Sequence, residues 1–153
     1  GREMAGDALI ARAEQTMTAA RARLAPAQRA RPLLLFVFAD DRHGWIADRN
    51  GLVQGIMNEL GLANAWRGTA SFWGYSVVGI DALASAPEAG IVYADFGLAD
   101  PAPALRSPIW HALPAVRAGR TASIPRFWYF GGLPTAMRLA EQLADSVASM
   151  PLG

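Results

Sequence analysis

The sequence contains no cysteine, which excludes disulfide bonds, thiolate metal sites and cysteine nucleophiles. Lysine is absent as well, so all 14 basic residues are arginine. With 13 acidic residues, the net charge is only +1. That balance provides no strong field for nucleic acid or anionic lipid, and we expect no nucleic-acid partner. The longest apolar run, residues 33–39, is far shorter than the roughly 20 residues that span a bilayer.

Apolar residues are plentiful, at 52% of 153 positions, which is enough for one well-packed domain. Apolar side chains recur at steps of three and four from Leu9 to Leu24, which predicts a long amphipathic helix that Pro26 ends. This segment does not resemble a charged and apolar signal peptide, so we expect any export signal to lie outside these residues. We assign residues 1–30 to the long helix and its linker, and residues 31–153 to a separate lobe.

Strand and helix patterns alternate through that lobe. Strands are expected at residues 33–39, 76–78, 91–94 and 121–124, and helices at 52–60, 82–86, 108–113 and 135–149. Asp81 precedes the second of these helices, where its carboxylate can cap the helix N-terminus. The alternation predicts an α/β fold: a three-layer lobe whose mainly parallel sheet is flanked by helices, preceded by the long helix.

Signatures of catalysis are missing. Without lysine there is no phosphate-binding P-loop, and Gly74–Val78 lacks the final glycine and the histidine partner of a nucleophile elbow. Asp40, Asp41 and His43 are better explained as a solvated loop whose carboxylates cap backbone amides than as metal ligands. His111, beside a tryptophan, is expected to be packed. We therefore expect no enzyme activity, no catalytic residues, no protein metal site and no cofactor.

Three loops that follow expected strands each contain tryptophan: residues 40–50, 64–75 and 126–132. In open α/β sheets ligands bind beyond the carboxyl ends of the strands, so these loops are candidates for a binding site. Large rigid rings in a crevice suit a bulky, partly apolar ligand. For Trp73 and Trp128, binding and core packing are equally open on these grounds alone.

Alternation divides the aromatic run at residues 127–130 between two faces. If the run is extended, Trp128 and Phe130 share one side, and Phe127 and Tyr129 share the other. Phe127 is expected to belong to the core.

The resemblance to a known family is carried by short motifs in a fixed order. They are Arg31-Pro32-Leu33-Leu34-Leu35, Arg42-His43, Asn64-Ala65-Trp66-x-Gly68, Phe72-Trp73-Gly74, Ile80-Asp81-x-Leu83-Ala84, Pro108-Ile109-Trp110-x-Ala112-Leu113-Pro114, Val116-Arg117-Ala118-Gly119-Arg120, Pro125-x-x-Trp128, Gly131 and Ala136-Met137. Together they resemble the C-terminal lobe of periplasmic ferric-hydroxamate siderophore-binding proteins, the ferrichrome-type carriers. The first helix resembles the helix that joins the two lobes in this class III binding-protein fold.

The resemblance implies a carrier that collects a ferric siderophore in the periplasm and presents it to an inner-membrane ABC permease. It implies an N-terminal lobe that these residues do not include. Because the siderophore chelates the iron, the resemblance implies neither a protein metal ligand nor a cofactor. The family holds hydroxamate oxygens with groups of its other lobe, so this chain by itself is expected to bind ligand weakly.

Site residues follow from the resemblance by position. Ligand-binding positions fall on Trp45, Ser71, Trp73, Trp128 and Phe130, and the permease-docking acid falls on Asp81. Where the family often has tyrosine this chain has Phe130, so a hydroxyl is lost there; neighbouring Tyr129 is a candidate to replace it, although alternation turns it the other way.

Two other functions remain open on the sequence. One is a binding lobe for another bulky chelate, such as a catecholate siderophore, haem or a corrinoid; an anionic catecholate complex would call for Arg42, Arg67 or Arg126 at the crevice. The other is a fragment of a small α/β hydrolase or transferase, against which the missing nucleophile motif argues.

Overall fold

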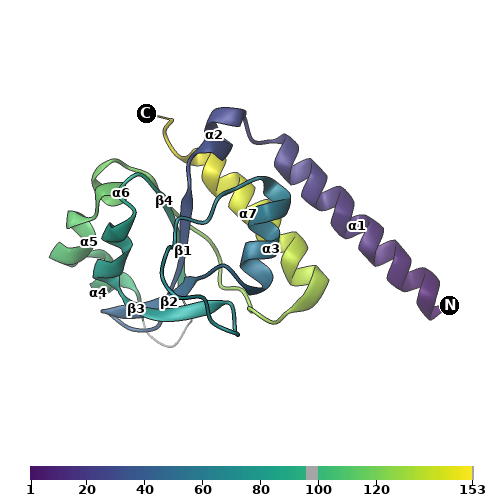
Figure 1. Cartoon of the computed structure of the whole chain (residues 1–153), viewed down its shortest axis with the longest axis horizontal. Helices are drawn as coiled ribbons and strands as arrows, with labels where there is room; N and C mark the ends of the chain where they lie inside the picture. The colour runs from purple at the N-terminus through teal and green to yellow at the C-terminus, as the bar shows by residue number, and fades with distance from the viewer. Residues whose placement is uncertain (96–99, 153) are drawn as a thin grey trace.

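The computed structural model describes residues 1–95 and 100–152. Its centre is a five-stranded sheet covered by helices on both faces, which is the three-layer α/β lobe predicted (Figure 1). On one face lie α1 (Arg2–Ala22), α3 (Gly51–Leu60) and α7 (Gly132–Ser149). The other face is covered by short helices: η1 (Ile80–Ser85), α4 (Ala102–Leu105), α5 (Pro108–Ala112) and α6 (Pro114–Arg117).

The sheet has the strand order β3-β2-β1-β4-β5. Strands β1 (Leu33–Phe38), β4 (Gly90–Asp95) and β5 (Thr121–Ser123) are parallel, and all three were predicted. Strand β2 (His43–Ala47) runs antiparallel to β1 on one side and to β3 (Tyr75–Gly79) on the other. Strand β2 was not predicted, because a short segment interrupted by glycine has no clear strand pattern.

Gly44 is the residue that lets β2 approach β1. An added Cβ there would overlap the ring of Phe36 and the backbone oxygen of Val37. A residue without Cβ is therefore required for this pairing. The glycine that obscured the strand in the sequence is what allows the strand to form.

Strand β1 is buried on both faces, as its unbroken apolar run predicts. Leu33, Leu35 and Val37 point into the core beneath α1, α3 and α7, whereas Leu34 and Phe36 pack beneath the short helices. The two cores hold the sheet rigidly between them, so that the loops leaving its strands have a fixed base.

Two local predictions on the second face are wrong. The segment after β3 is the 3₁₀ helix η1, with Gly79 at its N-cap position and no side-chain capping bond, so Asp81 does not cap it. Asp81 lies within the first turn instead and is exposed. His111 was expected to be packed and is exposed, because α5 turns its neighbour Trp110 toward the core.

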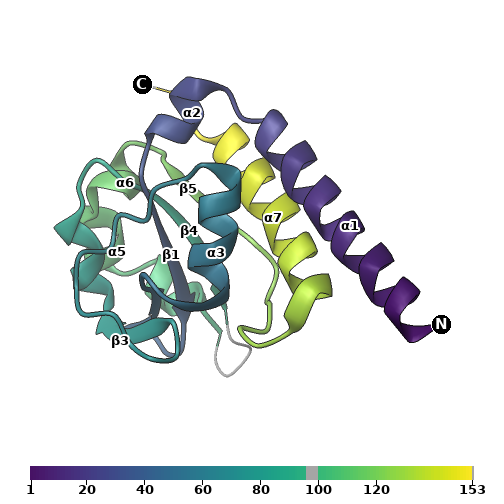
Figure 2. The same cartoon turned by 45° about the vertical axis from the view of Figure 1, so that its right-hand side comes forward.

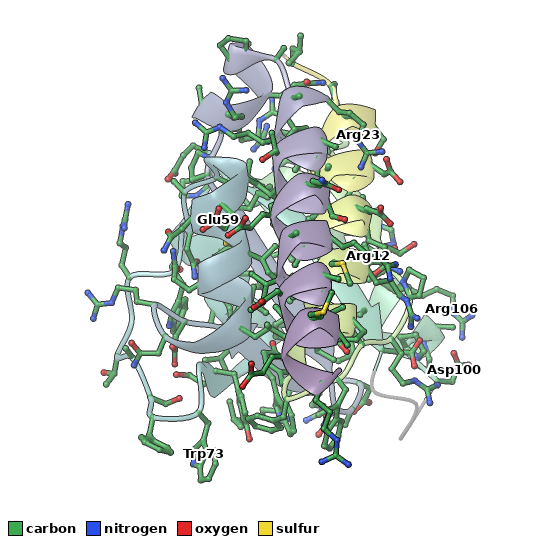
Figure 3. The ribbon with its side chains drawn as sticks, turned by 90° about the vertical axis from the view of Figure 1, so that its right-hand side faces the viewer. Arg12, Arg23, Glu59, Trp73, Asp100 and Arg106 are labelled. Atoms are coloured by element: carbon green, nitrogen blue, oxygen red, sulfur yellow. The ribbon has the colours of Figure 1, made fainter. Side chains whose placement is uncertain are left out.

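Helix α1 is tied to the lobe along its second half only. Its buried residues are Ala13, Met17 and Ala20, and it lies across α3 and α7 (Figures 2 and 3). Residues 2–12 contain no buried side chain, and this end of the helix extends beyond the rest of the lobe. The division at residue 30 remains a prediction.

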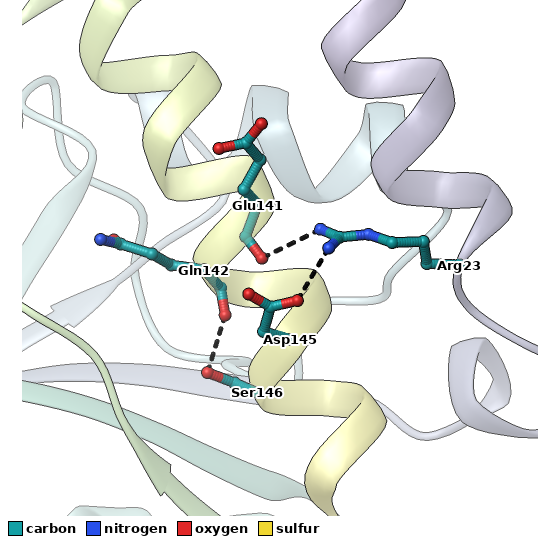
Figure 4. Close-up of polar contacts among 5 residues, drawn as sticks. All are labelled: Arg23, Glu141, Gln142, Asp145 and Ser146. Atoms are coloured by element: carbon teal, nitrogen blue, oxygen red, sulfur yellow. Dashed lines mark hydrogen bonds and ion pairs between the residues drawn. The ribbon is translucent and has the colours of Figure 1, made fainter.

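Arginine side chains fix the C-terminal end of α1. Arg23 donates to the Asp145 carboxylate at 2.8 Å and to the backbone oxygen of Glu141 at 3.3 Å (Figure 4). Arg21 donates to the backbone oxygen of Glu59 at the end of α3, at 3.4 Å. The expected linker after α1 contains a further helix, α2 (Pro26–Ala30), so Pro26 begins a helix instead of ending one.

Candidate ligand-binding site

Four exposed aromatic side chains from two loops lie next to one another; we call Phe72, Trp73, Trp128 and Phe130 the aromatic rim. The ring of Phe130 lies 6.1 Å from Trp73 and 5.8 Å from Trp128, centre to centre, so it links the two indoles. Phe72 stands edge-on to Trp73 at 5.1 Å. Figure 3 shows Trp73 projecting from one end of the molecule.

Exposure separates the rim from the core. The side chains of Trp73, Trp128 and Phe130 are 58%, 59% and 53% exposed, and Phe72 is 88% exposed. Rings of this size are rarely left open on a protein surface without a binding role, because together they form an apolar patch. The structure thus brings three of the predicted ligand-binding residues together at the surface.

A second aromatic cluster is partly buried and packs against the core of the lobe. Trp45 stacks on Tyr75 with ring centres 4.2 Å apart, and Tyr129 lies 5.3 Å from Tyr75 and 6.0 Å from Trp45. Phe127 packs on Tyr129 at 5.0 Å. The predicted alternation is confirmed: Trp128 and Phe130 face outward, while Phe127 and Tyr129 face the core.

Tyr129 therefore brings no hydroxyl to the rim in this conformation. It is only 5% exposed, and its hydroxyl has no hydrogen-bond partner among the described residues. Burial raises the pKa of this hydroxyl well above its ordinary value, and the nearby Asp48 carboxylate raises it further. Tyr129 belongs to the core, and Trp45 is partly buried against it.

Asp48 joins the segment after β2 to the loop that carries Phe72 and Trp73, and sequence reasoning missed it. Its carboxylate is fully buried and accepts the backbone N–H of Asn50 at 2.9 Å and of Ser71 at 2.7 Å. Asn50 in turn donates from its side chain to the backbone oxygen of Ser71 at 2.7 Å. The signal available in the sequence was the Asp-x-Asn spacing of an Asx turn ahead of a helix.

Ser71 is occupied by backbone bonds. Its hydroxyl donates to the backbone oxygen of Tyr75 at 2.6 Å and accepts the backbone N–H of the same residue at 3.2 Å. These bonds close the turn that carries Phe72 and Trp73. The hydroxyl proton is used within the turn, so the structure places Ser71 as a support of the rim loop.

The turn also depends on a close contact between two glycines. Gly74 has a φ of +84°, and an added Cβ would lie 2.8 Å from the backbone oxygen of Asn50 and 3.0 Å from the Cα of Gly51. Gly51 itself has a φ of +78°. The backbone at Gly74 must therefore lie directly against the backbone at residues 50–51. This close approach keeps Ser71 within hydrogen-bonding distance of Asp48.

We expect Gly74→Ala to destabilise the protein by about 2–4 kcal/mol, because it adds both a steric overlap and an unfavourable backbone conformation. Gly55→Ala is the matched control: Gly55 lies within α3, and an added Cβ would meet nothing within 4 Å. That change should stabilise the helix by about 0.5–1 kcal/mol. Urea unfolding of both variants measures the difference, and equal midpoints would contradict this account of the turn.

Asp81 lies apart from the rim, in a groove of about 620 Å³ between the start of β2 and the short helices. Arg42, His43 and the exposed Ile109 also line it. The groove is a surface distinct from the aromatic rim.

The loop before β2 behaves as a solvated turn. The Asp40 carboxylate accepts the backbone N–H groups of Arg42 and His43, each at 2.7 Å, and contacts the His43 ring at 3.3 Å. These hydrogen bonds lower the pKa of Asp40, and the bond from the Arg42 backbone has the largest effect. Within residues 1–95 and 100–152, no three His, Asp or Glu side chains are grouped to hold a metal ion. Among the described residues, none of the helices combines the length and the hydrophobicity that a membrane span requires.

The model of the periplasmic binding protein family matches residues 1–126, most of the sequence. The chain belongs to this family. It is 38% identical, over 119 residues, to the iron(3+)-hydroxamate-binding protein FhuD of Escherichia coli K12, which confirms the resemblance found in the motifs. That match covers 77% of this chain and 40% of the relative, so the chain spans less than half the length of the protein it matches.

Solved structures show the same fold. FhuD of Vibrio cholerae with bound Fe³⁺–Desferal matches with a TM-score of 0.80 at 21% identity, over 97% of this chain and 55% of that protein. The triscatecholate siderophore-binding protein FeuA of Bacillus subtilis matches with a TM-score of 0.80 at 17% identity, over 100% of this chain and 56% of its own length. Because the fold is shared by carriers named for different chelates, the fold alone does not identify a ligand.

Proposed function

We propose that this chain is the C-terminal ligand-binding lobe of a two-lobed periplasmic carrier that captures ferric hydroxamate siderophores for an ABC importer. The observation that carries the proposal is the aromatic rim, in which Phe130 links Trp73 and Trp128 at an open surface. The identity to the hydroxamate-binding relative supports the same ligand class. The role is binding, with the iron arriving already chelated, so neither a catalytic residue nor a cofactor is required.

The charge of the rim favours hydroxamate over catecholate. A ferric tris-hydroxamate complex is neutral, whereas a ferric tris-catecholate carries a threefold negative charge that must be matched by cations. None of the four rim residues is charged. Among the candidate arginines, Arg42 lies in the Asp81 groove, and the charge of Arg126 is partly neutralised by Asp95 at 3.5 Å.

One lobe offers only part of a site. Covering the exposed part of each ring is worth about 1–2 kcal/mol, and association itself costs several kcal/mol, so three half-exposed rings support only weak binding. A second lobe closing over the ligand supplies the remaining contacts. The same reasoning applies to haem and corrinoids, which would also use the rim but lack the support of the hydroxamate-binding relative.

Calorimetric titration tests the proposal. The two-lobed protein, expressed from the complete reading frame, should bind ferrioxamine B with micromolar affinity or better, and ferric tris-catecholate and haem at least about tenfold more weakly. The 153-residue chain should bind ferrioxamine B weakly or not at all. Tight binding by this chain alone would refute the need for a second lobe, and a preference for the catecholate would refute the ligand class.

The alternative of a hydrolase has a separate test. A screen of the 153-residue chain against generic esters should give no turnover above the uncatalysed rate. Turnover that is lost in a Ser76→Ala variant would overturn the binding role.

We further propose that Asp81 contacts an arginine of the permease, as the resemblance implies. Asp81→Arg in the two-lobed protein should lower siderophore-dependent iron uptake by cells about tenfold or more, because attraction becomes repulsion at the docking surface. Ligand affinity measured by titration should stay unchanged. Glu88→Arg, another exposed acid away from the groove, is the control and should leave uptake unchanged. Equal iron uptake by the Asp81→Arg and Glu88→Arg variants would show that Asp81 has no role in docking to the permease.

A further inference from the structure

A second cavity, of about 540 Å³, lies behind Trp128. It is formed between segment 126–128 and one face of α7, on which residues 135, 138, 139 and 142 lie close together because they are spaced by one helical turn. Phe127 and Leu139 provide an apolar floor, and Trp128 forms a wall shared with the aromatic rim. We call this space the α7 pocket.

Two arginines make the α7 pocket cationic. Arg126 and Arg138 both line it, and none of its lining residues is acidic. Within the part of the chain that the structure describes, Arg138 has no ion pair. The pair between Arg126 and Asp95 is long, at 3.5 Å, and largely exposed, so it neutralises the guanidinium only in part. A planar guanidinium beside an apolar surface can bind a carboxylate through two parallel hydrogen bonds.

Gln142 adds a polar group that lacks a partner. It lines the α7 pocket, and its Oε1 is buried without a hydrogen-bond partner among the described residues. A carboxylate has no N–H or O–H group to offer this acceptor, so the two arginines, and not Gln142, determine the preference for a charged guest. The cavity thus combines an apolar floor, two cations and one free acceptor.

We propose that the α7 pocket binds an apolar chain that ends in a carboxylate. The chain lies on Phe127 and Leu139, and the carboxylate is held by Arg126 and Arg138. Such a group has two sources: a pendant arm of the chelate that lies on the rim, or a free carboxylic acid. A pendant arm of the chelate rests on the proposed function, because it requires a chelate on the rim, which shares Trp128 with the pocket. A free carboxylic acid does not depend on the proposed function.

The pocket lies wholly within these 153 residues, so the chain itself can be tested. Hexanoate should shift the indole N–H resonance of Trp128 in ¹H–¹⁵N spectra, with a dissociation constant of about 1 mM for so small a ligand. Hexanamide, which has the same shape without the charge, should bind about tenfold more weakly. Equal binding of acid and amide, or no shift with either, would overturn the proposal.

Arginine variants test which side chains bind the carboxylate of hexanoate. Arg138→Gln and Arg126→Gln should each weaken hexanoate about tenfold and leave hexanamide unchanged. Arg12→Gln, on α1 and outside the α7 pocket, is the matched control and should leave both ligands unchanged (Figure 3). All three arginines are exposed, so folding should be preserved, and the spectra themselves report it. Unchanged hexanoate affinity in both pocket variants would overturn the assignment.

Derivatives of ferrioxamine B separate the two sources in the two-lobed protein. The N-succinyl derivative and its methyl ester have the same arm and differ only in charge. If the pocket takes the arm, the acid binds about tenfold more tightly, and Arg138→Gln removes the difference. If acid and ester bind equally while hexanoate binds the chain, the source is a free acid. If no derivative binds at all while hexanoate does, the proposed function fails and the pocket stands.

Discussion

Replacing Trp73 and Trp128 together by alanine should lower the affinity of the two-lobed protein for ferrioxamine B by about 30-fold to 1,000-fold. Each indole is a little more than half exposed in the free lobe, so a ligand that covers it removes that remaining apolar area from water. The gain is about 1–2 kcal/mol for each ring, and because both rings contact Phe130 the two losses should add only approximately.

Quenching of the remaining tryptophan fluorescence, or calorimetry, measures this loss. Both side chains are exposed, and their removal should leave the urea midpoint nearly unchanged. Ile109→Ala is the matched control, since Ile109 is a similarly exposed apolar residue in the groove beside Asp81. Affinity retained within about threefold in the double variant would show that the ligand does not lie on the rim.

The fold was largely predictable because its main elements have local signatures. The unbroken apolar run of β1 indicates a strand covered on both faces, and the periodic apolar residues of α7 indicate a helix with one buried side. Strand β2 has neither signature. It exists because its neighbours β1 and β3 provide hydrogen-bonding partners on both sides and because Gly44 fits against Phe36, and both conditions belong to the assembled sheet.

Some features of the candidate site could likewise be predicted from local sequence, and others could not. Alternation correctly separated the outward Trp128 and Phe130 from the inward Tyr129, although residues 129–130 lie in a turn and not in a continuous extended segment. The pairing of Trp73 with Phe130 joins loops more than fifty positions apart; the position of both loops after strands indicated a shared edge of the sheet, and the motif resemblance singled out the residues. The α7 pocket had no signal at all, because the distance between segment 126–128 and α7 is set by tertiary packing.

Asp48→Ala should destabilise the lobe by about 2–4 kcal/mol and disorder the loop that carries Trp73. The buried carboxylate accepts two backbone N–H groups from different loops, and alanine leaves both without an acceptor. Asp48→Asn retains one acceptor oxygen but turns an amide N–H₂ toward the other donor, so about half of the loss is expected. Urea unfolding gives the stability, and the ¹H–¹⁵N resonance of the Trp73 indole reports the order of the loop.

Asp41→Ala is the matched control for Asp48→Ala. Asp41 carries the same charge and comes from the same stretch of sequence, but its side chain is exposed, so its loss should cost less than about 0.5 kcal/mol. Phe72 and Trp73 are held in place by a turn that begins at Ser71, and Asp48 fixes that residue, so ligand affinity should fall with Asp48→Ala and not with Asp41→Ala. If Asp48→Ala lowered stability while leaving the Trp73 resonance and the affinity unchanged, the buried carboxylate would serve the fold alone, and the rim would have to be positioned by the packing of Trp73 on Phe130.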